Sequence, residues 1–289
     1  MQINAYQLQT FTKDGAGGNE AGVVLGADGL TETMMKQIAA QLGFSETAFV
    51  LQSDHADCKV RFFTPNEEVD FCGHATVGTF FTFSRQGLLQ PGKYSQETKA
   101  GVFAVEVTAD LTIMMNQPLP RFYETIDPQA IAASLKIAVA DLAADLPVQA
   151  VSTGLKDILV PVKNLDVLRS IAPDFEKVAA ISRQYQAIGY HVFTLETLHG
   201  STAHCRNFAP LYGIPEESAT GTSNGALACF LYQYGRIDPN QARNIIIEQG
   251  YSMQKPSEIL AALSIANGTI AEVKVGGKAA NLTLSAVEI

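Results

Sequence analysis

The stretch RFFTPNEEVDFCGHATVGTFF, residues 61–81, has a counterpart in the second half of the chain, RNFAPLYGIPEESATGTSNGALACF, residues 206–230. Both carry Arg, Phe and Pro at the same offsets and then reach a glycine that opens an apolar, helix-like run, although the loop before that glycine is three residues longer in the second copy. Two copies of strand, loop and helix predict two similar α+β domains. If the two halves face each other, both helix starts point into one central cleft.

The segments around these copies predict a mixture of helices and strands. Residues 31–44 have apolar residues at helical spacing between a capping Thr31 and a terminating Gly43. In the second half, Asp127 and Pro128 begin a predicted helix whose apolar stripe continues to Leu142. Residues 272–289 predict a strand, a Gly-Gly turn and a strand. Two prolines near residue 119 mark the expected boundary, which gives domains 1–118 and 119–289, with the last strand a candidate to return to the first domain.

Composition narrows the function classes. The chain has 289 residues, 47% of them hydrophobic and 17% charged, with a formal net charge of -9. This charge disfavours binding to nucleic acids and to anionic membrane surfaces. There is no apolar run of membrane-spanning length and no basic segment followed by an apolar run at the start, so we expect a soluble, cytoplasmic protein. The four cysteines are widely spaced, which predicts reduced thiols and no metal centre.

Glu46 lies in SETAFV, residues 45–50, where the alternation otherwise predicts a strand covered on both faces. An ionised carboxylate in apolar surroundings is costly unless it is paired or neutralised. The residues alone therefore leave two interpretations: a structural carboxylate bonded to backbone or to an arginine, or an acid/base group with a catalytic task.

The two predicted helix starts, Gly73-His74 and Gly221-Thr222, suggest an anion site. The first turn of a helix offers unpaired backbone N–H groups and a partial positive charge, and a glycine lets the backbone approach a ligand closely. A small carboxylate-bearing molecule is the partner that this arrangement favours. His74 itself is either a cap or core residue, or a group that contacts the substrate and relays a proton.

Seven motifs, taken in order, resemble those of the PhzF-like phenazine-biosynthesis family: GNEAGVV, SETAFV, residues 61–79, VSTGL, NFAPLYGIPEESATGT, EQG followed by KPSEI, and VGG. The resemblance implies the fold of diaminopimelate epimerase and proline racemase, with two similar domains, each a sheet wrapped around a central helix, and the active site between them. It also implies a homodimer without cofactors. Glu46 matches the general acid/base of the family, and Gly73, His74, Gly221 and Thr222 match the residues that line the pocket for a substrate carboxylate.

The sequence departs from the family pattern at EESATGT, where EDPATGS is typical, so Glu217 replaces an aspartate that supports catalysis and Ser218 replaces a proline. We expect a cofactor-independent isomerase that moves a proton on carbon, with Glu46, His74 and Glu217 as catalytic residues. One alternative is a dehydratase or epimerase of the same fold that depends on Cys72; because Thr220 stands where a second thiol would be needed, two-thiol racemisation is disfavoured. Another is a binding protein that has lost catalysis.

Overall fold

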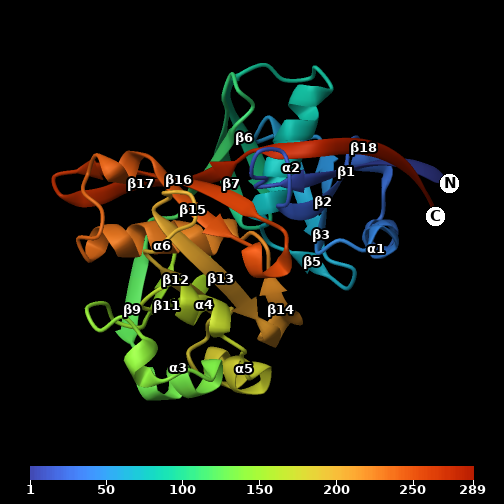
Figure 1. Ribbon diagram of the computed structural model, residues 1–289. Coiled ribbons are helices and arrows are strands. Elements are labelled where there is room, and N and C mark those ends of the chain that lie inside the picture. Colours follow the sequence, from blue (N-terminus) through green and yellow to red (C-terminus); the bar gives the residue numbers. More distant parts are fainter. The chain divides into compact units, whose positions relative to one another are not determined.

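The computed structural model describes residues 1–289 and contains two compact units, Met1–Asn116 with Gly276–Ile289, and Gln117–Val275. Each unit is a mixed sheet with one buried helix against it, which confirms the expected α+β organisation (Figure 1). The two units are described separately below.

The first unit combines nine strands with two α-helices and one 3-10 turn. The strands are β1 (Gln2–Thr10), β2 (Asn19–Val24), β3 (Glu46–Leu51), β4 (Cys58–Phe63), β5 (Glu68–Val69), β6 (Gly92–Thr98), β7 (Gly101–Val107), β8 (Ile113–Gln117) and β18 (Ala279–Glu288). The helices are α1 (Glu32–Leu42), α2 (Gly73–Arg85) and the 3-10 turn η1 (Ala27–Gly29). The sheet runs in the order β18-β1-β2-β3-β4-β6-β7-β8, with β5 added to β4. Only the β2–β3 and β4–β6 pairs are parallel.

Helix α1 follows the caps expected from the sequence. The Thr31 side chain accepts a hydrogen bond from the backbone N–H of Met34, and Gly43 ends the helix in the left-handed conformation. Its buried face packs with the start of β1 and with Phe49 and Phe63 in one apolar cluster. The helix thus delivers the chain directly to β3, whose first residue is Glu46.

Helix α2 lies against β1, β2, β3 and β18, and every residue from His74 to Thr82 is buried. A helix buried on all sides must satisfy its own polar groups. Thr76, Thr79 and Thr82 do so by donating their hydroxyls to backbone carbonyls four residues earlier. The sheet therefore fixes α2, and with it the residues at the start of the helix.

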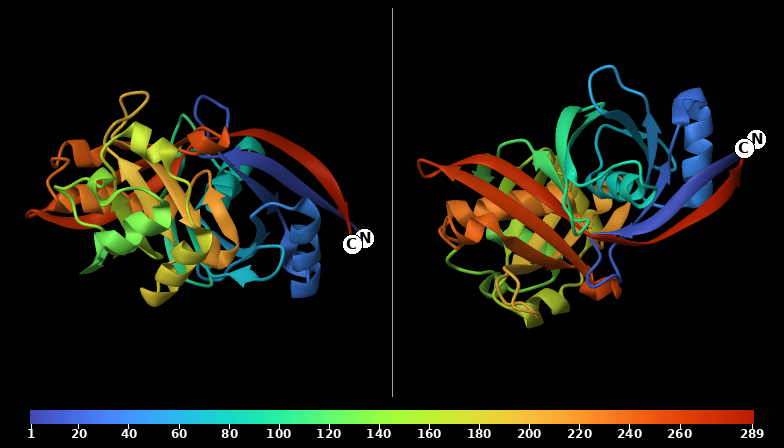
Figure 2. Two further views of the ribbon diagram at one scale, coloured as in Figure 1. Left: turned by 60° about the horizontal axis from the view of Figure 1, so that its bottom comes forward. Right: turned by 90° about the horizontal axis from the view of Figure 1, so that it is seen from above.

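Strands β1 and β18 form a long antiparallel pair that brings the two chain ends together (Figure 2). The amino terminus of Met1 is hydrogen-bonded to the carbonyl of Ile289, and the backbone N–H of Ile289 returns a bond of 2.9 Å to Met1. Met1 and Ile289, which are 288 positions apart in the chain, thus lie at one edge of the first unit.

The second unit repeats this plan. Its strands are β9 (Arg121–Thr125), β10 (Gln149–Ser152), β11 (Lys156–Pro161), β12 (Tyr190–Thr194), β13 (Ala203–Ala209), β14 (Ile214–Glu217), β15 (Ile245–Gln249), β16 (Ser257–Ala266) and β17 (Thr269–Gly277). Its helices are α3 (Pro128–Leu135), α4 (Leu165–Ser170), α5 (Phe175–Gln184), α6 (Gly221–Gln233) and the 3-10 turns η2 (Val139–Asp141), η3 (Pro210–Tyr212), η4 (Gln241–Arg243) and η5 (Tyr251–Met253). The order β9-β10-β11-β12-β13-β15-β16 again has two parallel pairs, β11–β12 and β13–β15.

The repeated Arg-x-Phe-x-Pro pattern has the same physical role in both units. Arg61 binds Glu68 through two hydrogen bonds of 2.7 and 2.8 Å, and its guanidinium lies 5.0 Å from the centre of the Phe63 ring. Arg206 binds Glu216 through two bonds of 2.9 Å and lies 4.9 Å from the Phe208 ring. Both pairs tie the strand to the short strand that precedes the buried helix, β5 or β14.

The predicted helix from Asp127 to Leu142 is wrong in length. Asp127 and Pro128 begin α3 as expected, but Lys136 adopts φ 57° and ends the helix after Leu135. The Asp141 carboxylate accepts the backbone N–H of Ala138 and so stabilises a separate 3-10 turn, a local bond that competes with helix continuation.

The predicted Gly-Gly turn is also wrong. Gly276 and Gly277 end β17 without a positive φ, and β18 then pairs with β1. Gly276 is small for a different reason, because a Cβ there would lie 1.9 Å from the carbonyl oxygen of Ile113. The glycine permits close approach of two backbones rather than a reversal of the chain.

Candidate active site

Glu46 begins β3, and its side chain is 16% exposed. One carboxylate oxygen, Oε2, lies 3.2 Å from Nε2 of His74, yet this buried oxygen accepts no hydrogen bond. No arginine contacts Glu46, and the arginine nearest in the strand pairing, Arg61, is bound to Glu68. Glu46 thus has one buried carboxylate oxygen that lies beside His74 and is not used in a hydrogen bond.

His74 is the second residue of α2, and its ring is 5% exposed. Its Nε2 atom also lies 3.3 Å from the Ser45 hydroxyl, and its Nδ1 atom lies 3.3 Å from Sγ of Cys72. Burial lowers the pKa of His74 below its ordinary value, against the opposing effect of the nearby Glu46 carboxylate. A neutral imidazole at neutral pH can donate from one nitrogen and accept at the other.

The side chains of Glu46, Cys72 and His74 each offer an atom that can bind a metal ion, and these three atoms lie within 4.8 Å of one another. Glu46 approaches Nε2 of the ring, whereas Cys72 lies closer to Nδ1 than to Nε2, at 3.3 against 3.8 Å. The carboxylate and the thiol thus both contact the imidazole of His74.

The start of α2 keeps backbone donors for a ligand. Its N-cap, Cys72, makes no side-chain capping bond, and the first turn contains no acidic residue. The N-cap of α6, Thr220, has the same two properties, and its φ of -129° is close to the -142° of Cys72. Each helix start can therefore bind an anionic group through its backbone N–H groups.

The predicted residues of the second unit also lie together at a helix start. Glu217 ends β14, and its Oε2 accepts a hydrogen bond of 2.6 Å from the Thr220 hydroxyl. Gly221 and Thr222 are the first two residues of α6 and are buried, and the carbonyl of Thr222 accepts the Thr153 hydroxyl at 3.0 Å. The structure thus brings together Glu46, Cys72, Gly73 and His74 in one unit, and Glu217, Gly221 and Thr222 in the other.

Three acidic residues near His74 in the sequence have no contact with the group formed by Glu46, Cys72 and His74. Glu68 binds Arg61, and Asp70 forms an ion pair of 3.0 Å with Lys99. Glu67 is exposed.

Sequence reasoning missed a buried polar cluster in the second unit. Asp157, His191, Asn207, Ser223, Asn224 and Gln249 are almost completely buried and are joined by hydrogen bonds. These residues come from four strands and from α6, so no local spacing could have revealed the cluster. The signal that was present is the motif EQG, which contains Gln249.

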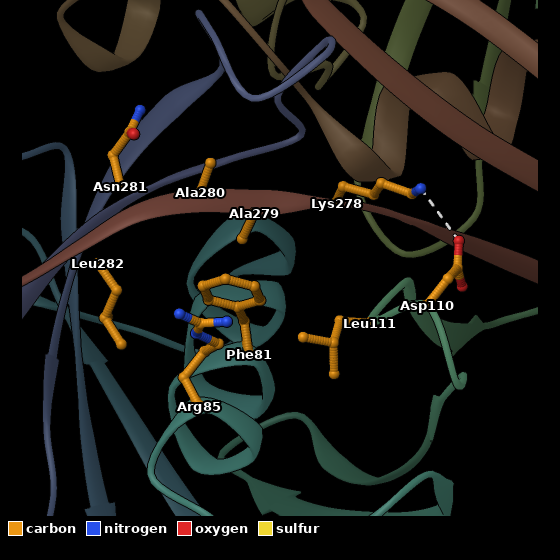
Figure 3. Close-up of a pocket in the computed structure, with 9 residues that line it drawn as sticks. All are labelled: Phe81, Arg85, Asp110, Leu111, Lys278, Ala279, Ala280, Asn281 and Leu282. Carbon is orange, nitrogen blue, oxygen red and sulfur yellow. Dashed lines mark ion pairs between the residues drawn. The ribbon is translucent and has the colours of Figure 1, made fainter.

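A pocket in the first unit is lined by neither Glu46 nor His74 (Figure 3). It is formed by the second half of α2, the β7–β8 turn and the start of β18, and contains an ion pair of 3.0 Å between Lys278 and Asp110. Hydrogen bonds from Thr108 and Lys278 hold the pKa of Asp110 well below its usual range. Phe81 is seven residues beyond His74, which separates them by roughly 10 Å along the helix. An aspartate held ionised in this way is a poor proton carrier, so the pocket is not the candidate active site.

The family described as phenazine biosynthesis-like protein matches residues 8–284. The chain belongs to this family. Among its relatives, an uncharacterised isomerase of Bacillus subtilis, YfhB, is 35% identical over 276 residues, which are 93% of each chain. The crystal structure of a PhzF-family phenazine biosynthesis protein from Bacillus anthracis is 34% identical, covers 100% of both chains and has a TM-score of 0.92. The trans-2,3-dihydro-3-hydroxyanthranilate isomerase of Pseudomonas chlororaphis is 26% identical over 93% of this chain and 94% of its own.

Members of the phenazine biosynthesis-like family are named isomerases, and this protein is accordingly assigned as an isomerase. A proline racemase structure from Agrobacterium radiobacter, with a TM-score of 0.65 and 12% identity, shares the fold alone. No helix of the protein combines the length and the apolar character needed to cross a lipid bilayer.

Proposed function

We propose that the protein is a cofactor-independent isomerase that removes a proton from carbon in a small carboxylate-bearing molecule and returns it elsewhere, with Glu46 as the general acid/base. The observation that carries this proposal is the buried Oε2 atom of Glu46, which lies 3.2 Å from His74 and accepts no hydrogen bond. A base must have an available oxygen within reach of the proton that it takes.

Other candidate residues of each unit fit the same chemistry. Negative charge develops beside a carboxylate when a neighbouring carbon loses a proton, and the uncapped helix starts at Gly73 and Gly221 supply backbone donors that stabilise such charge. His74, neutral at neutral pH, can hydrogen-bond the substrate or pass a proton between Glu46 and the substrate. Glu217 is held by Thr220 and acts as a second carboxylate that orients the substrate.

The substrate class is proposed from the site and from one relative. The helix starts favour a carboxylate, and the Pseudomonas chlororaphis relative is named for an amino hydroxy carboxylate with a cyclohexadiene ring. We therefore propose small amino, hydroxy or cyclohexadiene carboxylates as substrates.

A proton-exchange screen in heavy water tests the proposal. The protein and its Glu46→Gln variant are incubated with a panel of such carboxylates, including trans-2,3-dihydro-3-hydroxyanthranilate, and deuterium entry at carbon is followed by mass spectrometry. We expect exchange with the wild type and none with Glu46→Gln. Glu106→Gln, also half-buried on a strand of the first unit, is the matched control and should retain exchange. Exchange that persists in Glu46→Gln would contradict the assignment of Glu46.

A second candidate is a dehydratase or epimerase that uses the Cys72 thiol. It is favoured by the 3.3 Å contact between Sγ and Nδ1 of His74, because an imidazole beside a thiol can take its proton. In this case Cys72→Ala abolishes exchange and Glu46→Gln retains it. Substrate should also protect Cys72 from alkylation.

A further inference from the structure

Gln249 is the last residue of β15 and is completely buried. Its side chain makes five hydrogen bonds, a long one of 3.7 Å from Sγ of Cys205 and four to the segment that begins α6. Its Nε2 donates to the Glu217 carbonyl at 2.8 Å and to the Thr220 hydroxyl at 3.1 Å, and its Oε1 accepts from the Thr220 backbone N–H at 3.2 Å and from Asn224 at 2.7 Å. The amide thus uses both donors and two acceptor positions within eight residues of chain.

These contacts fix the direction of the Thr220 hydroxyl. The oxygen accepts from Gln249, so its single proton is left to point at Oε2 of Glu217, 2.6 Å away. A donor that is held in place in this way favours the ionised form of the carboxylate and fixes where it points. Gln249 therefore acts on Glu217 through Thr220.

Buried neighbours fix the orientation of Gln249 in turn. Asn224 donates to Gln249 and to the carbonyl of Thr220, and its Oδ1 faces Nε2 of His191 at 3.1 Å. The other ring nitrogen of His191 lies 3.1 Å from the Nδ2 donor of Asn207. His191 must then carry its proton on Nε2 and be neutral, which agrees with burial lowering its pKa to about 4.

The first unit has no equivalent of this arrangement. Glu97 and Glu248 occupy matching positions, since Glu97 pairs with Lys59 at 2.8 Å and Glu248 pairs with His204 at 2.7 Å on the matching strands. The residue that follows Glu97 is Thr98, whose hydroxyl bonds the carbonyl of Gly101. In the first unit Gln96 donates to Thr76, the fourth residue of α2, and not to the N-cap residue. A glutamine bonded to the N-cap residue of the buried helix is therefore specific to the unit that carries Glu217.

We propose that Gln249 is a positioning residue, which holds the Thr220 hydroxyl as a permanent donor to Glu217 and fixes the first turn of α6. The proposal rests on the proposed function, in which Glu217 orients the substrate. The effect of Gln249 on the Glu217 carboxylate can be measured in the protein without substrate.

The test is a titration of the Glu217 carboxyl by NMR in protein with ¹³C-labelled glutamate, assigned with Glu217→Gln. Removal of the hydroxyl in Thr220→Val should raise the titration midpoint by about 1–2 units, because a hydrogen bond to a charged group favours the ionised carboxylate by about that much. Thr220→Ser keeps the hydroxyl and should leave the midpoint unchanged. Gln249→Met, which removes the amide, and Gln249→Asn, which shortens it, should both raise the midpoint.

The double variant Gln249→Met with Thr220→Val should shift the midpoint no further than Thr220→Val alone, since one residue acts through the other. Gln96→Met is the matched control: Gln96 is also fully buried and donates to a hydroxyl of a buried helix, that of Thr76, in the first unit. None of these variants replaces a residue of the Arg206–Glu216 ion pair. An unchanged midpoint in folded Gln249→Met and Gln249→Asn would overturn the proposal, as would additive shifts in the double variant. Failure of Glu46 as the base would leave this titration unaffected.

Discussion

Replacement of Asp157 with Asn should change how stability depends on pH. Burial raises the pKa of Asp157 to about 7, against an ordinary value of 3.8, although Ser223 and the backbone of Gly189 donate hydrogen bonds to the carboxylate. Between these two values the native protein keeps a proton that the unfolded chain has released. The free energy of unfolding therefore falls as the pH rises through this range. Below the pKa of the unfolded chain, Asp157 causes no such loss of stability.

The size of the effect follows from the two pKa values. Linkage gives a penalty of about 1 kcal/mol at pH 4.5 and about 4 kcal/mol at pH 8, a difference of about 3 kcal/mol. An asparagine side chain can still accept the hydroxyl of Ser223, but it does not titrate. Relative to the wild type, Asp157→Asn should thus gain about 3 kcal/mol of unfolding free energy as the pH rises from 4.5 to 8.

Urea unfolding of both proteins at several pH values measures this difference, because other titrating groups cancel in the comparison. Any constant cost of the amide also cancels, since only the change with pH is used. A difference that stays constant between pH 4.5 and pH 8 would refute the reasoning, because it would mean that Asp157 titrates in the same range in the native and unfolded states.

Two further predictions concern the repeated arginines and a glycine that precedes β12. Arg206→Ala should destabilise the protein by about 2–3 kcal/mol and Arg61→Ala by about 1 kcal/mol, measured by urea unfolding. Arg206 is the more buried of the two and also donates to two backbone carbonyls, that of Leu168 in α4 and that of Ile171 at the end of α4. Equal losses would contradict this ranking. Gly189→Ala should destabilise the protein by about 3 kcal/mol or more, because a Cβ would lie 2.0 Å from the carbonyl oxygen of Phe208. Gly29→Ala is the control, because a Cβ at Gly29 would meet no atom within 4 Å and Gly29 has no positive φ. A comparable loss of stability in Gly29→Ala would show that the clash is not the cause.

The sequence was most informative where the cause is local. Thr31 and Gly43 have capping roles that depend on a few neighbouring residues, and the structure confirms both. The repeat around Arg61 and Arg206 was also recognisable, because it keeps the same residue types at the same offsets. The ion pairs that explain the two arginines involve residues of the short strands β5 and β14 at different offsets, so they become visible only in the structure.

The sequence was least informative where the cause is a distant partner. Gly276 and Gly277 resemble a turn, but the need for glycine comes from the backbone of Ile113, more than 160 residues earlier. Likewise, Gln249 stands in an apolar strand with no local reason for an amide. Its partners, Thr220 and Asn224, are on a helix that begins almost 30 residues earlier. The positions of Glu46 and His74 were predicted, whereas their catalytic roles stay predictions that the exchange experiment tests.

The pairing of β18 with β1 has a consequence for synthesis on the ribosome. The second unit is a continuous segment, residues 117–275, so all of its strands have been made before residue 276 is added. The first unit must wait for residues 279–288, because these supply the partner for one side of β1. Until then β1 presents an unpaired edge, the kind of exposed strand that invites pairing with another chain. The first part of the protein to be synthesised is thus the last to complete its sheet, and it depends longest on protection of that edge.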